Sequence, residues 1–331
     1  MVKVVLDAMG GDQAPDAALE GVVLAIEKEF VGVEELVLVG QPEILEKRLA
    51  EMGQSDLGIE VVGASQVVGC DESPVEAMRR KPDSSISVGI GLVKSGSADA
   101  FVSAGSTGVV AAAASLGLGT LDGIRRPGIA TIVQSDKGPF MLLDVGANPQ
   151  PKPLHLQQYA LMGSAYFQCA VGKPEPRVAL MNIGKEAAKG NALTREVTEL
   201  LAEAPINFVG NVEGVDLFQG NCDVVVCDGF TGNVMIKVSE GLVEYVMRLV
   251  VESLSELGID KSHIQGVLTA VRPRLDYSAY GGALLLGAKG TVTICHGRST
   301  PLAFANALKF AKQAVATRVN EQIVAMVQET S

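Results

Sequence analysis

Short apolar runs alternate along this chain with longer segments whose apolar residues recur at helical spacing. The short runs predict strands, and most are followed by a turn and then by a segment long enough for a helix; a hairpin-like step joins residues 129–133 to 140–143. Predicted strands lie at residues 2–6, 36–39, 59–62, 99–103, 129–133, 140–143, 177–181, 206–209, 223–226 and 291–295, and predicted helices at 17–26, 42–52, 86–94, 109–116, 154–171, 234–257 and 301–327. This alternation predicts an α/β fold with a mostly parallel sheet and helices on both faces.

Two of the predicted strand–turn–helix units are closely similar to each other. Residues 99–108 (DAFVSAGSTG) and 223–232 (DVVVCDGFTG) share Asp, Gly, Thr and Gly at the same offsets. Each begins as a strand, turns through small residues and ends where a helix starts. Backbone N–H groups at such a helix start are free to bind an anion. We therefore expect two anion-binding turns that face one cleft, or one such turn and one with a structural role only.

Polar residues also follow the first predicted strand. Asp7 and Asp12 surround the paired glycines Gly10 and Gly11, which permit a tight turn and a close approach of the backbone. The two carboxylates either orient loops or bind a metal with other carboxylates. No metal-ligand spacing in the sequence supports the second alternative.

Further candidates follow later strands, where ligands bind to open parallel sheets. Asp144 and Asn148 lie in a small-residue turn, and both residue types also form turns for purely structural reasons. Lys189 lies beside Gly and Asn after a strand and is either a phosphate or carbonyl ligand or a surface lysine. His296 lies between a strand and a Gly-Arg-Ser sequence and is either a site residue or a hydrogen-bonded structural histidine.

Composition narrows the class of protein. The chain has 331 residues, 47% of them hydrophobic, with 37 glycines and no tryptophan, which suits an α/β enzyme rich in tight turns. It has no uncharged apolar run of about 18 residues, so we expect no membrane span. Residues 1–7 are too short for a signal peptide. The five cysteines and three histidines form no metal-binding pattern, which predicts a reduced, cytoplasmic protein without a structural metal.

Charge is distributed unevenly over a chain whose net charge is −11. Residues 261–318 contain eight basic residues and one acidic residue, so this segment is +7 and the remainder is −18. The asymmetry predicts an acidic partner or an anionic surface for the C-terminal part, or a helical face that is merely basic. Nucleic acid is not expected, because aromatic residues are only 4% and are not interleaved with basic ones.

Residues 242–274 have the features of a separate helical element. A helical stripe is followed by a shorter apolar face with basic residues beside it. The shorter face and its flanks comprise Ile264, Val267, Leu268, Val271, Arg272 and Arg274. Such a segment suits a helix at a membrane surface, and equally a dimer interface or a core helix.

The strand-end motifs, taken together, resemble those of the PlsX family of bacterial acyl-[acyl carrier protein]:phosphate acyltransferases. The matching motifs are residues 7–12 (DAMGGD), 103–108 (SAGSTG), 143–148 (LDVGAN), 182–191 (NIGKEAAKGN), 210–214 (GNVEG), 227–233 (CDGFTGN) and 296–299 (HGRS). They occur in the family order from residue 1 to about 315. The resemblance implies a two-lobed fold like those of isocitrate and isopropylmalate dehydrogenases and of phosphotransacetylase. Residues 1–331 are then one catalytic unit of two intertwined lobes, with 242–274 as a helical projection.

The resemblance also implies a reaction and its partners. Inorganic phosphate and acyl-[acyl carrier protein] give acyl-phosphate and the free carrier, and the product is passed to a membrane glycerol-phosphate acyltransferase on the way to phosphatidic acid. The enzyme is expected to be a homodimer, bound peripherally to the inner face of the membrane, and to use no cofactor. Phosphate is itself an anionic nucleophile and a thioester is an activated acyl group. The reaction therefore needs positioning and oxyanion donors rather than a catalytic triad.

Site residues carry over from the matched motifs. Lys189 and Asn233 are predicted to supply charge and a hydrogen-bond donor at the reacting carbonyl. Asp7, Asp228 and His296 are candidates for orienting groups or for the proton donor to the departing pantetheine thiol. The residues predicted to bind substrate are Asp7, Gly10, Gly11, Asp12, Ser103, Gly105, Ser106, Thr107, Gly108, Asp144, Asn148, Asn182, Asp228, Gly229, Thr231 and Gly232. Three positions depart from the family pattern: Ser106, Val215 and Leu284 stand where Asn, Arg and Pro are common. Ser106 removes an amide donor near the acyl or phosphate site.

Other functions share this chemistry or this fold. A phosphotransacetylase of the coenzyme A type would run the same reaction with a different thiol. A nicotinamide-dependent dehydrogenase would need metal-binding carboxylates and a nucleotide pocket. A lipid-binding protein without catalysis would leave the polar strand-end loops without a purpose.

Overall fold

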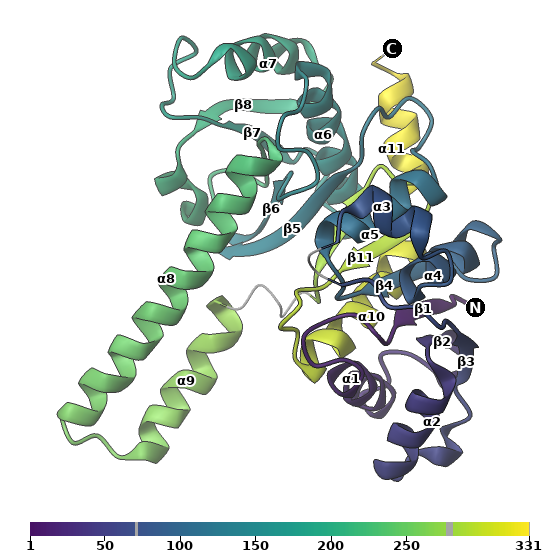
Figure 1. Cartoon of the computed structure of the whole chain (residues 1–331). Helices are drawn as coiled ribbons and strands as arrows, with labels where there is room; N and C mark the ends of the chain where they lie inside the picture. The colour runs from purple at the N-terminus through teal and green to yellow at the C-terminus, as the bar shows by residue number, and fades with distance from the viewer. Residues whose placement is uncertain (70–71, 276–280, 331) are drawn as a thin grey trace.

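One eleven-stranded sheet extends through the protein in the order β3-β2-β1-β4-β11-β10-β5-β6-β9-β7-β8 (Figure 1). The computed structural model describes residues 1–69, 72–275 and 281–330, with the side chains of 272–275 left out of the description. The strands are β1 (Val4–Asp7), β2 (Leu36–Gly40), β3 (Glu60–Gly63), β4 (Ala100–Ser103), β5 (Gly128–Ser135), β6 (Gly138–Leu143), β7 (Arg177–Met181), β8 (Asn207–Val212), β9 (Val224–Val226), β10 (Ala283–Leu286) and β11 (Thr291–Ile294).

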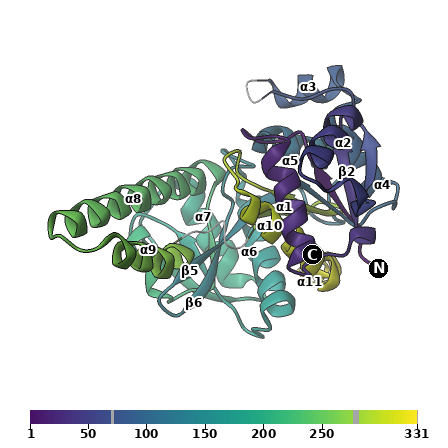
Figure 2. The same cartoon turned by 90° about the horizontal axis from the view of Figure 1, so that it is seen from below.

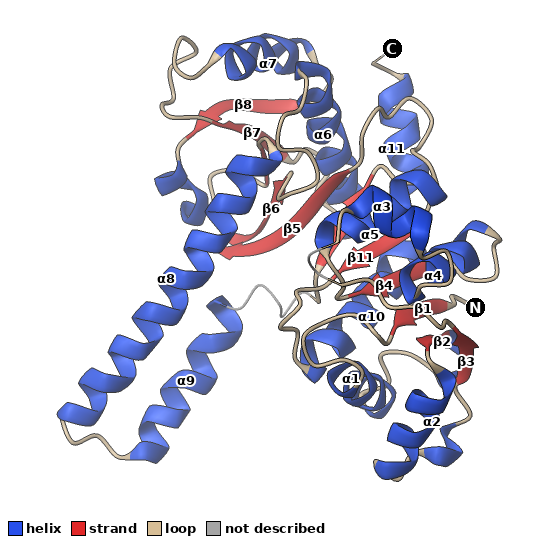
Figure 3. Ribbon diagram, in the orientation of Figure 1, coloured by secondary structure: helices blue, strands red, loops and turns tan. Residues whose placement is uncertain are grey.

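Helices cover both faces of this sheet (Figures 1 and 3). They are α1 (Asp16–Glu27), α2 (Pro42–Glu51), α3 (Pro74–Arg80), α4 (Ser85–Lys94), α5 (Thr107–Gly117), α6 (Pro153–Tyr166), α7 (Ala192–Glu203), α8 (Gly229–Glu256), α9 (Lys261–Leu275), α10 (Pro301–Ala316) and α11 (Val319–Gln328). The predicted C-terminal helix at 301–327 is divided in two, because the backbone at Arg318 is left-handed (φ 51°). The prediction of a mostly parallel α/β sheet with helices on both faces is confirmed.

Strand direction divides the sheet into two groups. The first group (β3, β2, β1, β4, β11) and the second group (β6, β9, β7, β8) are each parallel throughout. Three antiparallel pairings, β11–β10, β10–β5 and β5–β6, lie between them. An odd number of reversals makes the two groups run in opposite directions. The loops that follow their strands therefore leave from opposite edges of the sheet, which the apolar pattern could not predict.

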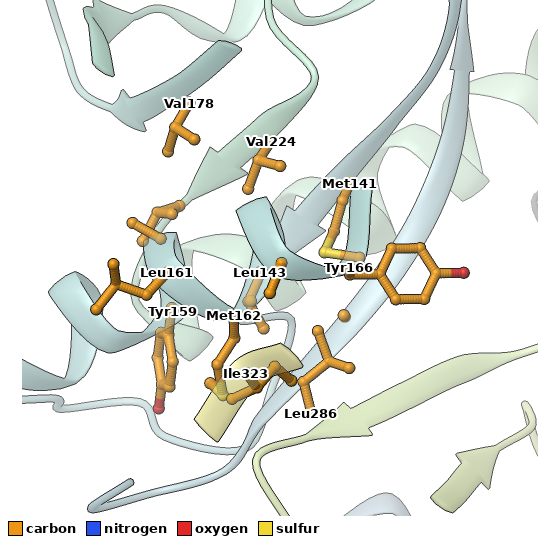
Figure 4. Packing of buried hydrophobic residues seen from close by; sticks show 14 of the residues in the cluster. Met141, Leu143, Tyr159, Leu161, Met162, Tyr166, Val178, Val224, Leu286 and Ile323 are labelled. Atoms are coloured by element: carbon orange, nitrogen blue, oxygen red, sulfur yellow. The ribbon is translucent and has the colours of Figure 1, made fainter. Parts of the chain in front are cut away.

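Alternating residues of β6 face two different layers. Met141 and Leu143 pack with α6 in the largest hydrophobic cluster, whereas Phe140 and Leu142 pack on the other face with residues at the start of α8. Figure 4 shows Met141 and Leu143 together with Tyr159 and Met162 of α6. The strand is apolar at successive positions because both of its faces are covered.

Helices α8 and α9 form a hairpin that projects from the sheet (Figures 1 and 2). Only Gly229 and Gly232 are buried on α8, both in its first turn. On α9, Ile264 is buried and Leu268 is half-buried, while Val267 is 41% exposed. The predicted apolar face of 264–271 is thus turned partly inward. Arg272 and Arg274 belong to α9, but their side chains lie outside the described residues.

Close packing of α6 on the sheet leads to a stability prediction. A Cβ atom added at Gly163 would collide with Val224, whereas one added at Gly91, on the exposed side of α4, would meet nothing within 4 Å. We expect Gly163→Ala to lower the free energy of unfolding by about 1–3 kcal/mol through overpacking. Gly91→Ala should raise it by up to about 1 kcal/mol, because alanine is the better helix former. Urea denaturation measures both, and equal effects of the two substitutions would contradict this packing.

Candidate active site

Loops after β1 and β4 form a first cluster, centred on the buried carboxylate of Asp7. Ser103 Oγ donates to Asp7 Oδ2 at 2.7 Å, and the Met9 backbone N–H donates to Asp7 Oδ1 at 3.0 Å. The backbone N–H of Gly105 in turn donates to Ser103 Oγ at 3.0 Å. Burial raises the pKa of Asp7, while these donors oppose the rise. Asp7 and Ser103 therefore hold the two turns together, and their polar atoms are already used within the protein.

Glycines let the two turns of this cluster approach closely. A Cβ atom on Gly10 would lie 2.7 Å from both Asp7 Oδ2 and the backbone nitrogen of Gly105, so only glycine fits. Gly11 has a φ of 105°, which glycine adopts without strain. The Asp12 backbone N–H donates to the carbonyl of Gly297 at 2.8 Å and ties the first turn to the loop after β11.

Helix α5 begins at this cluster with an open N-terminus. Ser106 is its N-cap residue but makes no side-chain capping bond, and Thr107 and Gly108 are exposed. Within the described part of the chain, no protein group accepts from the backbone N–H groups of residues 106–109. The first glycine turn therefore presents unpaired donors and the positive end of a helix dipole.

A second cluster surrounds the buried carboxylate of Asp144, at the end of β6. Asp144 Oδ1 accepts from the N–H groups of Ile129, Gly146 and Ala147 at 2.9–3.0 Å. Its Oδ2 accepts from the N–H of Asn148 at 2.7 Å. Burial raises the pKa of Asp144, and these four donors counteract it. Asp144 organises residues 145–148 rather than facing a ligand.

The N-terminus of α8 is closed by this second cluster. Asp228 is the N-cap residue: it accepts from the Thr231 N–H at 2.8 Å and from Thr231 Oγ1 at 2.6 Å. The Gly229 N–H donates to the carbonyl of Asn148 at 2.9 Å, and a Cβ atom on Gly232 would collide with the Asp144 carbonyl. The two turns therefore differ: α5 has an open N-terminus, whereas α8 is capped by a carboxylate.

Two predicted residues keep their functional groups available beside this cluster. Asn233 is exposed after the capping turn, and no described side chain or backbone group hydrogen-bonds its amide. Lys189 is exposed in the loop after β7, and within the described residues its ammonium has no ion-pair partner. Asn182 closes that loop by donating to the Lys189 carbonyl at 3.2 Å. Strands β7 and β9 are neighbours, so the two loops leave adjacent strand ends.

The two clusters are linked across the junction of the strand groups. Lys237 Nζ of α8 lies 3.0 Å from His296 Nε2, which follows β11. Glu240 lies 3.5 Å from Lys237 and 3.8 Å from Arg298. Val145 and Ala147, beside Asp144, pack against the hydrophobic cluster of the first group. Loops from opposite sheet edges thus meet through α8 and the 144–148 turn.

Lys237 and Glu240 were not predicted as site residues from the sequence. They lie on α8, one and two turns beyond Asn233. A signal was present, because residues three and four apart share one face of a helix. The Arg298 N–H donates to His296 Nδ1 at 3.2 Å, so a neutral imidazole carries its own proton on Nε2, the nitrogen that faces Lys237 Nζ. Burial lowers the pKa of His296, and the nearby Lys237 ammonium lowers it further. Both effects favour the neutral imidazole over the charged one.

An apolar groove of about 860 Å³ runs from this junction between α8 and the sheet. His296 and Glu240 lie at one end, and Val251 of α8 and Leu268 of α9 also line it. Polar residues such as Glu244, Arg248 and Glu252 also line it, together with nine further apolar side chains: Val133, Phe140, Leu142, Leu217, Phe218, Met235, Ile236, Val243 and Met247. From Met235 to Val251, the groove follows roughly 24 Å of helix at 1.5 Å per residue.

Solved structures with this fold include enzymes of two kinds. A phosphotransacetylase from Streptococcus pyogenes aligns with a TM-score of 0.63 at 18% identity, covering 95% of this chain and 94% of that one. A 4-hydroxythreonine-4-phosphate dehydrogenase from Klebsiella pneumoniae aligns with a TM-score of 0.54 at 13% identity, covering 95% of this chain and 100% of that one. At such identities the likeness concerns the fold alone, and it agrees with the dehydrogenase- and phosphotransacetylase-like fold expected from the sequence.

Relatives in sequence are far closer. A protein named phosphate acyltransferase from Heliobacterium modesticaldum is 45% identical over 332 residues, which cover 99% of this chain and 97% of the relative. Another of that name, from Desulforamulus reducens, is 46% identical over 317 residues, covering 95% of this chain and 94% of the relative. A family model described as fatty acid synthesis protein matches residues 2–322. The chain therefore belongs to the fatty acid synthesis protein family, the PlsX family indicated by its strand-end motifs.

Proposed function

We propose that this phosphate acyltransferase transfers an acyl group from acyl carrier protein to inorganic phosphate, as the first step toward phosphatidic acid. A phosphate oxygen attacks the thioester carbonyl, the carbon–sulfur bond breaks, and acyl-phosphate and the carrier thiol leave. The names of the relatives support the acyltransferase chemistry. The observation that supports a long-chain acyl donor most strongly is the apolar groove beside the strand-end residues, because a groove of this size suits a large apolar ligand.

Phosphate is assigned to the open N-terminus of α5. The unpaired N–H groups of residues 106–109 and the helix dipole favour a dianion there, and the Thr107 hydroxyl can add a donor. The α8 N-terminus is a poorer choice, since the Asp228 carboxylate already caps it. Ser106, at the position where the family commonly has Asn, would then lie beside the nucleophile without closing the turn.

Asn233 and Lys189 are assigned to the reacting carbonyl. An amide N–H and an ammonium stabilise the oxyanion of the tetrahedral intermediate, where charge develops during attack. Both side chains are exposed and free of described partners, whereas Asp144, Asn148, Asn182, Asp228 and Thr231 are engaged in hydrogen bonds that shape their loops. The latter residues position the site rather than contact the reacting atoms.

The departing thiolate needs a proton. Lys237 Nζ and His296 Nε2 lie 3.0 Å apart at the junction, and both are groups that can donate a proton. We assign Lys237 as the proton source and His296 as the group that orients it or passes the proton on. The sequence left His296 as an orienting group or as the proton donor, and this assignment keeps it beside Lys237 as an orienting group or a relay.

The projecting hairpin is assigned to partners outside the active site. Val238, Leu242, Tyr245 and Leu249 form an exposed apolar stripe on α8 that suits a second copy of the chain. Leu257 and Ile259, exposed at the tip, suit a peripheral contact with the inner face of the membrane, where a glycerol-phosphate acyltransferase would receive the product. Among the described residues, no helix is long and apolar enough to cross a membrane.

Turnover of the wild type and of two variants tests this function. Palmitoyl-[acyl carrier protein] (palmitoyl carrier) and phosphate should give palmitoyl-phosphate. Palmitoyl-coenzyme A should be a poorer acyl donor, and calorimetry should detect no binding of NAD. Lys189→Ala and Asn233→Ala should each lower turnover by about 10²–10³-fold, as expected for loss of one oxyanion donor. Lys94→Ala, an exposed lysine of α4, is the matched control and should keep full turnover. Near-normal turnover in the first two variants would remove their assigned role.

The Lys237–His296 contact makes a spectroscopic prediction. Lys237→Met removes a cation that lowers the pKa of His296 while leaving Glu240, whose charge raises it. The pKa of His296 should therefore rise in an NMR titration, and those of His155 and His263 should not move. Since the chain has three histidines, their signals can be assigned by substitution. An unchanged His296 titration would mean that the two side chains are not in contact.

Two variants of the α8–α9 hairpin distinguish the surface proposed for a second copy of the chain from the surface proposed for the membrane. Leu242→Ser with Leu249→Ser should shift a dimer toward the monomer in analytical ultracentrifugation, because the apolar stripe is interrupted. Leu257→Ser with Ile259→Ser should leave the dimer intact and weaken binding to liposomes that contain phosphatidylglycerol. Loss of neither property in either variant would show that the hairpin contacts neither partner.

A further inference from the structure

A group of exposed cations lies at the N-terminal end of α6, near the Asp144 cluster. Arg125, Arg126 and Lys152 are exposed, and within the described residues none of them forms an ion pair. His155 is half-buried between them, and the charges that act on its imidazole are those of Arg126 and Lys152. We call Arg125, Arg126, Lys152 and His155 the basic corner.

Hydrogen bonds hold the two segments of the basic corner in place. The Arg125 N–H donates to Gln158 Oε1 at 2.9 Å, and Gln158 Nε2 donates to the carbonyl of Gly123 at 2.7 Å. On the other segment, the Lys152 N–H donates to His155 Nδ1 at 3.1 Å. The backbone positions of these cations are therefore fixed, and their side chains form one surface at the N-terminal end of α6.

This surface adjoins the second site cluster. Asn148 Nδ2 donates to the carbonyl of Pro127, next to Arg126, at 2.7 Å. The carbonyl of Asn148 accepts from Gly229, four residues before Asn233. The basic corner lies on the α6 side of β6, whereas the apolar groove lies on the α8 side. A flexible arm anchored at the basic corner would cross the strand-end edge past Asn233 and carry an acyl chain into the groove.

We propose that the basic corner is the docking surface for the acidic face of the acyl carrier protein. This inference rests on the proposed function, since it needs a carrier-bound acyl donor. Exposed, separated cations suit a partner with several carboxylates at its surface, because complementary charge orients two proteins and speeds their encounter. The surface differs from the basic segment 261–318 expected from the sequence, whose Arg298 lies beside Glu240 at the groove.

Charge reversal tests the proposal. The triple variant Arg125→Glu, Arg126→Glu, Lys152→Glu should raise the Kd for purified carrier by roughly tenfold or more and raise the KM for palmitoyl carrier likewise, with kcat at saturation unchanged. The wild-type Kd should increase with salt, and that of the variant should depend on salt far less. The control variant Lys28→Glu, Lys47→Glu, Lys94→Glu makes the same change in net charge. Its exposed residues lie on or next to the helices α1, α2 and α4, and it should bind the carrier normally.

Acyl carrier protein that lacks its phosphopantetheine arm distinguishes two sources of negative charge: the surface of the carrier protein and the phosphate of the arm. If the carrier protein itself docks here, the triple variant loses affinity for the armless carrier and for the complete carrier alike. A loss confined to the complete carrier would assign the cations to the phosphate of the arm and overturn the proposal. The milder pair Arg125→Gln, Lys152→Gln should show a smaller change in the same direction and does not depend on three reversals being tolerated by the fold.

Failure of the docking proposal can be told apart from failure of the proposed function. A wild type that forms acyl-phosphate from palmitoyl carrier, together with a triple variant of normal Kd and KM, would overturn the docking surface alone. A wild type that forms no acyl-phosphate from any long-chain thioester would overturn the function, and the inference with it.

Discussion

The Asp144 carboxylate is the interaction on which the geometry of the site depends. It is fully buried, and its two oxygens accept four backbone N–H groups from β5 and from the turn after β6. An uncompensated carboxylate at this depth would be costly, so the four donors and the charge stabilise one another. The turn that they fix supports the first residues of α8 and, through Val145 and Ala147, contacts the first strand group. Displacing this turn would move Asn233, the groove and the contact between the two halves together.

The opposite directions of the two strand groups explain why such a junction is needed. In a sheet whose strands all run one way, the loops after them share an edge and a ligand site forms there directly. Here the loops of the two groups leave from opposite edges, so the open α5 N-terminus and the Asn233 turn can serve one reaction only if another element joins them. Helix α8 does this: its start rests on the second group, and its next turns contact His296 and Arg298 of the first. The same helix then continues as a wall of the apolar groove.

Much of the fold could be predicted from the sequence, because strand and helix periodicities are local properties. The strands that flank the site and the glycine turns after β4 and β9 lie where their patterns indicate. The directions of the strands could not be predicted, since an apolar run has no directional signal. The central strand β10 could not be predicted either, because its apolar run, Leu284–Leu286, is short. The two similar turns also diverge at their helix starts. Asp228, whose counterpart in the first turn is Ala104, caps α8 with its carboxylate, whereas the N-cap residue of α5 is Ser106, which makes no capping bond. Lys237 and Glu240 became candidates only when the fold brought His296 beside them.

The central claim is that an acyl chain enters the groove along α8 while its thioester lies at the junction of the two strand groups. Photo-crosslinking with a carrier that bears a palmitoyl-length chain with a terminal diazirine tests this most directly. We expect mass spectrometry to find the label on groove-lining peptides, around Met247 and Val251 of α8 or around Phe218, which packs on Phe140 of β6. Labelling confined to α1, α2 or α4 of the first group, with the α8 peptides unmodified, would contradict it.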